Sequence, residues 1–289
     1  MLFRDITILD KDYKVQPHYD VGIRQDRITY IGSEPPEEDY GEAYDGRRKL
    51  LMPGLYNAHS HNAMSLLRGY GERLSLSDWL HTRIFPFEAR MTPQDVYWGS
   101  LLGALEMMAN GIVSTTDMYF YGEANVQAML ESGLKMNFAS AVTIADDTDY
   151  RKTEKYWENC RLLQDAQGAG DGRIRIDLAI HAEYTNTERS VRQVAEEANA
   201  RMQVHLSETL EEHEGCKARH GKTPALFLAD LGYFDQPTTA AHCVWLDESD
   251  ELLLEDYGVT VATCPVSNLK LASGVAPLKS LRKREIAVG

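Results

Sequence analysis

The sequence predicts an α/β protein whose main part is a (β/α)8 barrel, the fold also called a TIM barrel. From Leu50 onward, short apolar runs alternate with longer helical patterns, which is the sequence form of repeated βα units. Eight such apolar runs occur. They are nearly continuous, as expected for parallel strands that are buried on both faces.

The first 49 residues have a different pattern and predict a small β domain. The segments ITIL and VGIRQDRITYIG alternate branched and polar residues, and Pro35 and Pro36 follow them as breakers. We therefore expect two domains, a small β domain at 1–49 and the barrel at 50–289.

The barrel elements follow in order along the chain. The expected strands are 50–58, 112–117, 135–142, 174–180, 202–206, 238–243, 259–263 and 285–289. The clearest helix has Pro93 in its first turn, after Thr92, and ends before Gly111. Further helices are expected at 123–133, 154–167, 187–199, 221–231 and 247–256.

An open, doubly wound sheet is the alternative fold. It requires a glycine-rich phosphate-binding turn after the first strand, and the residues there are Asn57-Ala58-His59-Ser60-His61. This sequence favours the barrel.

Composition and charge exclude several classes of partner. The chain has 30 Lys+Arg against 44 Asp+Glu and a formal charge of −14, which repels nucleic acids and anionic membranes. It has no apolar run of about 18 residues, and acidic residues interrupt its start, MLFRDITILDKDYK. The four cysteines form no CxxC pair, so we expect neither a disulfide framework nor a zinc knuckle. We expect a soluble, cytoplasmic protein.

Five histidines lie at the carboxyl ends of predicted strands, the rim that carries the active site in this fold. They are His59, His61, His181, His205 and His242. Residues two apart in a strand point to the same side, so one ion can accept both His59 and His61. Because imidazole is a common ligand of zinc and similar ions, this pattern predicts a metal site.

The segment HLSE places a carboxylate just after a strand histidine. His205 is suited to be a third ligand, and Glu208 to be a proton carrier that takes a proton from an activated water and passes it to the substrate. Glu208 is alternatively a first-turn acid favoured by the helix dipole. The nearby Glu211, Glu212 and Glu214 are expected to form a solvated helix face.

Two more histidines are candidates for contact with water or substrate. His242, in AAHCVWL, is placed to orient or polarise the attacking water or to bind the metal, and spacing does not separate these roles. His181, in AIHAEYT, either faces the substrate or is structural. No role is assigned to His18, His81, His213 and His220.

Several motifs in this order together resemble the amidohydrolase superfamily. They are LLMPGLYNAHSHNAMSLLRGYGERLSLSDWL, FPFEARMTPQD, MYF, VHLSET, AAHCVWL and CPVSNLKLASGVAPL. Within the superfamily they are most similar to the 5-methylthioadenosine/S-adenosylhomocysteine deaminases and to related chlorohydrolase- and guanine-deaminase-like enzymes. The resemblance implies a barrel with a small β-sandwich built from both chain ends, and one divalent metal ion, chiefly zinc, with iron in some relatives.

The resemblance also implies roles for single residues. It makes His59, His61 and His205 the metal ligands, Glu208 the proton shuttle and His242 the catalytic histidine. It further implies that Glu88, in FPFEAR, holds ribose hydroxyls and that His181 contacts the substrate.

Two features depart from the family pattern. The last metal ligand of the family is an aspartate at the end of the eighth strand, and this chain stops at EIAVG. We expect the protein to continue past Gly289, and the alternative is an incomplete, inactive fragment. Arginines expected after the third strand, where they would grip an amino-acid carboxylate, are absent from NFASAVTIADDTDY before Arg151. A neutral nucleoside or another aminated ring remains compatible.

We therefore predict a metal-dependent hydrolytic deaminase of an aminated purine nucleoside or related heterocycle, of the 5′-methylthioadenosine, S-adenosylhomocysteine or adenosine type. The alternatives are a chlorohydrolase-like enzyme, a guanine- or 8-oxoguanine-type amidohydrolase, and a non-catalytic metal-binding barrel. The expected partner is a small molecule. The surface near Met107 and Met108 is a candidate contact for a homo-oligomer. The sequence leaves the exact substrate, leaving group, metal and oligomeric state open.

Overall fold

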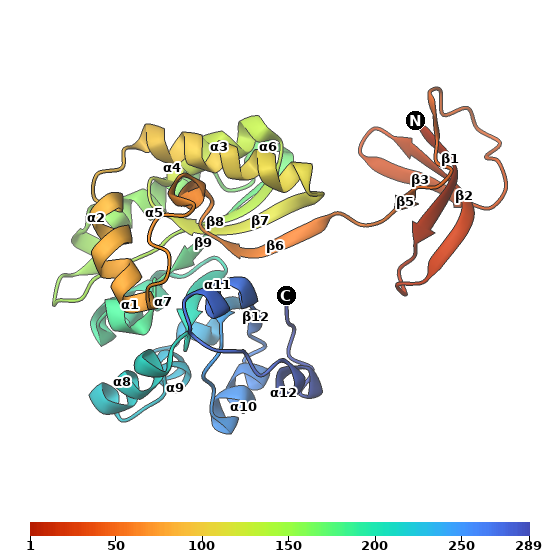
Figure 1. Cartoon of the computed structure of the whole chain (residues 1–289). Helices are drawn as coiled ribbons and strands as arrows, with labels where there is room; N and C mark the ends of the chain where they lie inside the picture. The colour runs from red at the N-terminus through yellow and green to blue at the C-terminus, as the bar shows by residue number, and fades with distance from the viewer. The chain divides into compact units, whose positions relative to one another are not determined.

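The computed structural model describes all residues from Met1 to Gly289 (Figure 1). The chain forms two compact units, Met1–Leu55 and Tyr56–Gly289. The domain limits expected from the sequence, 1–49 and 50–289, stay a prediction. No helix is both long and apolar enough to cross a membrane.

The N-terminal unit is a five-stranded sheet with the order β3-β2-β1-β4, in which β5 also pairs with β1. Its strands are β1 (Leu2–Leu9), β2 (Val15–Arg24), β3 (Arg27–Gly32), β4 (Ala43–Asp45) and β5 (Leu50–Leu51). The first three are antiparallel, whereas β4 and β5 run parallel to β1. Ile6, Ile8 and Val21 form its core.

The strand predicted at 50–58 is wrong at its start. Leu50 and Leu51 belong to the N-terminal sheet, and the first barrel strand begins at Leu55. Pro53 and Gly54 separate the two strands. Proline has no amide hydrogen for a strand ladder and glycine weakens a strand, so the apolar run does not continue as one element.

The second unit contains seven strands in chain order around one sheet, from β6 to β12. All the pairs from β7 to β12 are parallel. The strands are β6 (Leu55–Ser60), β7 (Ile112–Tyr119), β8 (Lys135–Ser140), β9 (Ile174–Ala179), β10 (Met202–Leu206), β11 (Thr238–His242) and β12 (Thr260–Ala262).

The end of the chain takes the eighth position. Val288 forms a parallel bridge with Val261 of β12, and the amide of Gly289 donates to the Val261 carbonyl at 2.9 Å. A Cβ added to Gly289 would lie 3.2 Å from Cβ of Ala58 in β6. The last residue therefore lies between the two edge strands, and the predicted (β/α)8 barrel is confirmed.

The predicted helices between the strands are present. They are α3 (Pro93–Ala109), α4 (Gly122–Ser132), α5 (Glu154–Asp165), α7 (Glu188–Glu197), α9 (Pro224–Asp230) and α10 (Glu248–Asp256). Thr92 and Asp95 cap α3 reciprocally, and Gly111 follows its end with a φ of 75°. Met107 of α3 is buried in the core and only Met108 is exposed, so the expected homo-oligomer contact loses one of its two methionines.

Several elements lie outside the helix ranges given by the sequence, although Glu211, Glu212 and Glu214 were expected on a helix face. They are α1 (Leu76–Trp79), a π-helical turn (Leu80–Ile84), α2 (Phe85–Glu88), α6 (Ala169–Gly172), α8 (Leu210–His220), α11 (Pro265–Lys270) and α12 (Leu278–Lys283). The helix α8 has no apolar stripe, because its buried residues are Glu212, His213 and Cys216. The predicted helix at 221–231 corresponds to α9 alone, because the sequence pattern indicated no range for α8.

Candidate active site

The five rim histidines lie together at the carboxyl ends of the barrel strands. Nε2 of His205, in β10, lies 3.1 Å from Nε2 of His59 and 3.2 Å from Nε2 of His61, both at the end of β6. The ring of His242, at the end of β11, has its centroid 5.4 Å from that of His205. The ring of His181, which follows β9, is 4.7 Å from His205 by the same measure.

Hydrogen bonds to backbone carbonyls determine which ring nitrogen of His61 and of His205 carries the proton. Nδ1 of His61 lies 2.6 Å from the Met118 carbonyl, and Nδ1 of His205 lies 2.8 Å from the His181 carbonyl. Because a carbonyl oxygen only accepts hydrogen bonds, each Nδ1 donates and each Nε2 is left with a lone pair. The two lone pairs face each other.

This donor set fits a divalent metal ion. Facing lone pairs 3.2 Å apart repel each other unless a cation lies between them. Two imidazole nitrogens bound to one zinc at about 2.0–2.1 Å, with near-tetrahedral angles, would themselves be about 3.0–3.4 Å apart. The two observed separations, from Nε2 of His205 to Nε2 of His59 and of His61, agree with that geometry.

The surroundings keep these imidazoles neutral, the form that binds metals. Burial, followed by the neighbouring histidines, holds the pKa of His59 and of His205 well below the usual value. Burial lowers the pKa of His61 as well, although its bond to the Met118 carbonyl opposes this. The pKa of His181 and that of His242 fall to about 4, mainly through burial.

Glu208 lies beside this cluster and is 5% exposed. Burial raises its pKa to about 7, and a hydrogen bond from the Ser273 hydroxyl at 3.4 Å opposes the rise. Its Oε1 is 3.5 Å from Nδ1 of His242. A carboxyl group with a pKa near neutrality is suited both to accept and to donate a proton.

His242 is oriented by a residue that the sequence did not indicate. Its Nδ1 lies 2.7 Å from Oδ1 of the buried Asn268, an oxygen that can only accept. The proton therefore sits on Nδ1 and leaves Nε2 free as an acceptor. Nitrogen atoms of His59, His205 and His242 lie within 4.8 Å of one another, so His242 is close enough to bind the ion or an attacking water.

The backbone leaves the extended conformation where β10 and β11 end. Ser207, His242 and Cys243 have φ of 47°, 72° and 49°. This left-handed region is costly for residues other than glycine and persists only where other contacts impose it. The Ser207 carbonyl accepts from the amides of Val244 and Trp245 at 3.1 and 2.9 Å, which ties the two strand ends together.

Glu88 and His181 line one cavity of about 470 Å³ together with His61. Tyr119 donates to Glu88 at 2.8 Å, and burial raises the pKa of Glu88 to about 7. Most other lining side chains are apolar, among them Met64, Trp79, Ile84, Phe85, Met118 and Phe120. The cavity has the size and apolar character of a site for a small organic molecule.

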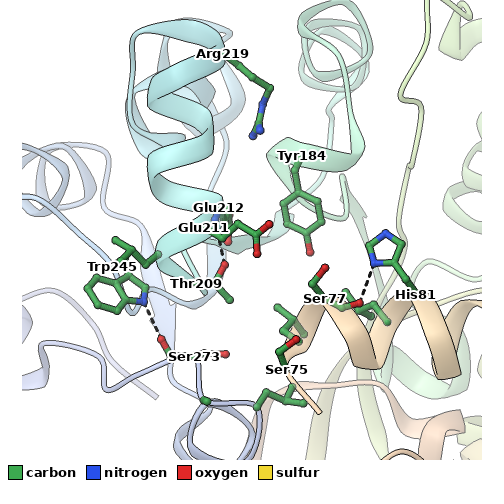
Figure 2. A pocket seen from close by; sticks show the side chains of 15 residues that line it. Ser75, Ser77, His81, Tyr184, Thr209, Glu211, Glu212, Arg219, Trp245 and Ser273 are labelled. Atoms are coloured by element: carbon green, nitrogen blue, oxygen red, sulfur yellow. Dashed lines mark hydrogen bonds between the residues drawn. The ribbon is translucent and has the colours of Figure 1, made fainter.

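A second cavity of about 520 Å³ adjoins the first, because both are lined by Leu80, His81 and Tyr184. Figure 2 shows Tyr184 and Glu211 on one side of it and the helix that carries Ser75 and Ser77 facing them. Sequence reasoning assigned His81 no role. The indole of Trp245 donates to the Ser273 carbonyl at 2.7 Å, which holds the loop that contacts Glu208 (Figure 2).

The prediction of a solvated face for the three glutamates of α8 is wrong for one of them. Glu211 and Glu214 are exposed, but Glu212 is buried and accepts from two backbone amides. Burial raises the pKa of Glu212 to about 8, and these two amides oppose the rise. In the local sequence, only its spacing of three residues after the cap Thr209 distinguishes Glu212 from the other two glutamates.

Comparisons with known proteins show the family to which the chain belongs. Residues 50–289 match the amidohydrolase family. The chain is 36% identical over 293 residues to a 5-methylthioadenosine/S-adenosylhomocysteine deaminase of Thermoanaerobacter pseudethanolicus, covering 100% of this chain and 68% of that protein. It is 38% identical over 286 residues to a 5′-deoxyadenosine deaminase of Methanosarcina barkeri, covering 98% and 66%.

Solved structures are also similar. An adenosine deaminase from Xanthomonas campestris with bound zinc superimposes with a TM-score of 0.84 at 27% identity, covering 100% of this chain and 68% of that one. An atrazine chlorohydrolase from Arthrobacter aurescens, complexed with zinc, gives a TM-score of 0.89 at 21% identity and coverage of 100% and 70%. The second likeness is one of fold alone.

Proposed function

This chain belongs to the amidohydrolase family, and we infer that it is a metal-dependent hydrolytic deaminase of an aminated purine nucleoside. The observation that carries this inference is the convergence of three imidazole Nε2 atoms beside the buried Glu208. The named relatives support the substrate class, since they include a 5-methylthioadenosine/S-adenosylhomocysteine deaminase and a 5′-deoxyadenosine deaminase.

We propose that His59, His61 and His205 hold one divalent metal ion. Zinc is the favoured metal because solved relatives contain it, and iron is the alternative. When it is bound in such a site, a divalent metal ion would activate a water molecule near neutral pH.

Glu208 and His242 then handle the proton and orient the water. Glu208 takes a proton from the attacking water, and its near-neutral pKa lets it pass that proton to a ring nitrogen of the base. The free Nε2 of His242 accepts a hydrogen bond from the water and directs it. The water oxygen bonds to the ring carbon, and its second proton passes to the exocyclic amino group. The bond between that nitrogen and the ring carbon then breaks, so ammonia leaves and the added oxygen remains as a carbonyl.

The cavity that contains Glu88 is the proposed nucleoside site. Glu88 is placed to accept hydrogen bonds from ribose hydroxyls, and His181 to contact the base. The lining residues include no lysine or arginine, which favours a neutral 5′ substituent over the charged tail of S-adenosylhomocysteine.

Ammonia release tests the proposal directly. Zinc-loaded protein is incubated with 5′-methylthioadenosine, S-adenosylhomocysteine, adenosine, guanine and 8-oxoguanine, and with a chlorinated triazine for the chlorohydrolase alternative. We expect ammonia from a nucleoside, 5′-methylthioadenosine foremost. If zinc is bound and no compound of the panel releases ammonia or chloride, the deaminase proposal is overturned and a non-catalytic barrel remains. Release of chloride from the triazine would instead support the chlorohydrolase alternative.

Location and self-association stay predictions of the sequence. We propose a cytoplasmic enzyme that acts on small molecules and binds neither nucleic acid nor membranes, in line with its formal charge of −14. Sedimentation of the purified protein at several concentrations tests whether it forms a homo-oligomer.

A further inference from the structure

Glu212 has an arrangement that its place on a charged helix does not explain. It is 5% exposed, and both of its carboxylate oxygens accept backbone amides of the preceding turn. Oε1 accepts from the amide of Ser207 at 2.9 Å, and Oε2 accepts from the amide of Glu208 at 2.7 Å. One buried side chain thus satisfies two consecutive amides at the end of β10.

These contacts differ from ordinary helix capping. In a capping box, the carboxylate in the first turn returns to the amide of the capping residue. Helix α3 follows this pattern, because Asp95 accepts from the amide of Thr92 at 2.8 Å. In α8 the cap is Thr209, yet the Glu212 carboxylate reaches past it to the two residues before. Glu212 therefore holds the strand-to-helix turn rather than the helix end.

The turn needs such a support. Ser207 has a φ of 47°, and this conformation sets the direction in which the next residue, Glu208, leaves the strand. Without the Glu212 carboxylate, two buried amides would lose their acceptors, and a buried amide without a partner is unfavourable. The turn would then relax and carry Glu208 away from His242 and Ser273.

We propose that Glu212 is a positioning residue for proton transfer, which holds the Ser207–Glu208 backbone so that the Glu208 carboxyl group faces the reacting atoms. The inference rests on the proposed role of Glu208 as proton carrier. Glu212 does not line the cavity that contains Glu88, which is the proposed nucleoside site, so its replacement should act on the catalytic rate and leave substrate binding intact.

The test compares Glu212→Gln with Glu211→Gln. Glutamine keeps one acceptor oxygen but turns its amide group toward the second backbone N–H, so one contact is lost. The control makes the same chemical change at the adjacent, exposed residue of the same helix. Steady-state rates, zinc content and hydrogen exchange of the Ser207 and Glu208 amides are measured for both variants.

For Glu212→Gln we expect kcat to fall roughly 10- to 100-fold, less than the about 10²–10⁴-fold contributed by a general acid–base group itself. KM for 5′-methylthioadenosine and zinc content stay within about twofold. The amide hydrogens of Ser207 and Glu208 should exchange with solvent at least about tenfold faster than in the parent protein. Glu211→Gln behaves as the parent protein in every measurement.

A kcat within about twofold of the parent, or a loss of zinc in step with kcat, would overturn the inference. Failure of the parent protein to release ammonia counts against the proposed function instead, and unchanged amide exchange then still refutes the Glu212 contact. If Glu212→Gln does not fold, the substitution is combined with Ser207→Gly, because glycine at position 207 adopts a positive φ without strain. The double variant must then show the same rate loss relative to Ser207→Gly alone.

Discussion

The ends of β6 and β10 supply histidines to the same point by different means. In β6 the chain stays extended, so His59 and His61 point to one side, and Ser60 turns to the other, where it donates to the Thr116 carbonyl at 3.0 Å. In β10, His205 is followed by the left-handed Ser207 before Glu208 appears.

The two strand ends therefore differ in what sets the direction of each side chain. At the end of β6 it follows from the two-residue period of any strand. At the ends of β10 and β11 it depends on contacts with side chains of later helices, namely Glu212 in α8 and Asn268 in α11. We therefore expect changes remote from the metal to act through β10 and β11 more than through β6.

We expect the largest effect from substitutions that remove a proposed metal ligand, and we expect the same effect at both strand ends. His59→Ala and His205→Ala should each weaken zinc binding by more than the about 10- to 100-fold typical of supporting residues, and ammonia release should disappear with the metal. Metal content measured after dialysis checks this. Unchanged zinc in either variant would show that the ligand assignment is wrong at that strand.

The next effect separates proton transfer from metal binding. Glu208→Gln keeps a similar shape but cannot take up a proton, so kcat should fall by about 10²–10⁴-fold while zinc is retained. Rate and metal content are measured on the same sample. Full turnover with metal present would assign the proton transfer to another group.

A smaller effect distinguishes the two regions directly. Asn268→Ala removes the acceptor that keeps the proton of His242 on Nδ1, and kcat should fall roughly 10- to 100-fold. The matched change at β6 is Ser60→Ala, whose hydroxyl points away from the metal site. It should lower the free energy of unfolding by about 1 kcal/mol and leave kcat unchanged. Equal rate losses would remove the distinction between the strand ends.

The smallest effect concerns Glu88 and is confined to binding. Glu88→Ala should raise KM for a nucleoside about tenfold and leave a free base unaffected. The carboxyl group is ionised above its pKa of about 7, so KM for the nucleoside should rise as the pH falls below that value. Glu88→Gln should abolish this pH dependence. An equal KM change for nucleoside and free base would argue against ribose recognition.

Much of the fold could be predicted because repeated burial leaves a periodic pattern. The strand expected at 202–206 is β10, with the same limits, and the histidine pair of β6 follows from strand geometry alone. The range of helix α8 escaped prediction, although its glutamates were expected on a helix face, because its buried residues are Glu212, His213 and Cys216 rather than an apolar stripe. The strand expected at 50–58 divided because Pro53 and Gly54 outweigh the apolar residues around them.

The barrel, its rim and the kinds of side chain that stand there could be predicted from the sequence, because they depend on residue type and on periods of two and of about 3.6. The directions in which Glu208 and His242 point became clear only in the folded chain. Their directions depend on positive φ values and on the buried partners Glu212 and Asn268, which lie 4 and 26 residues away. Contacts of that kind form only when the folded chain removes water from their polar atoms, so they leave no periodic signal along the chain.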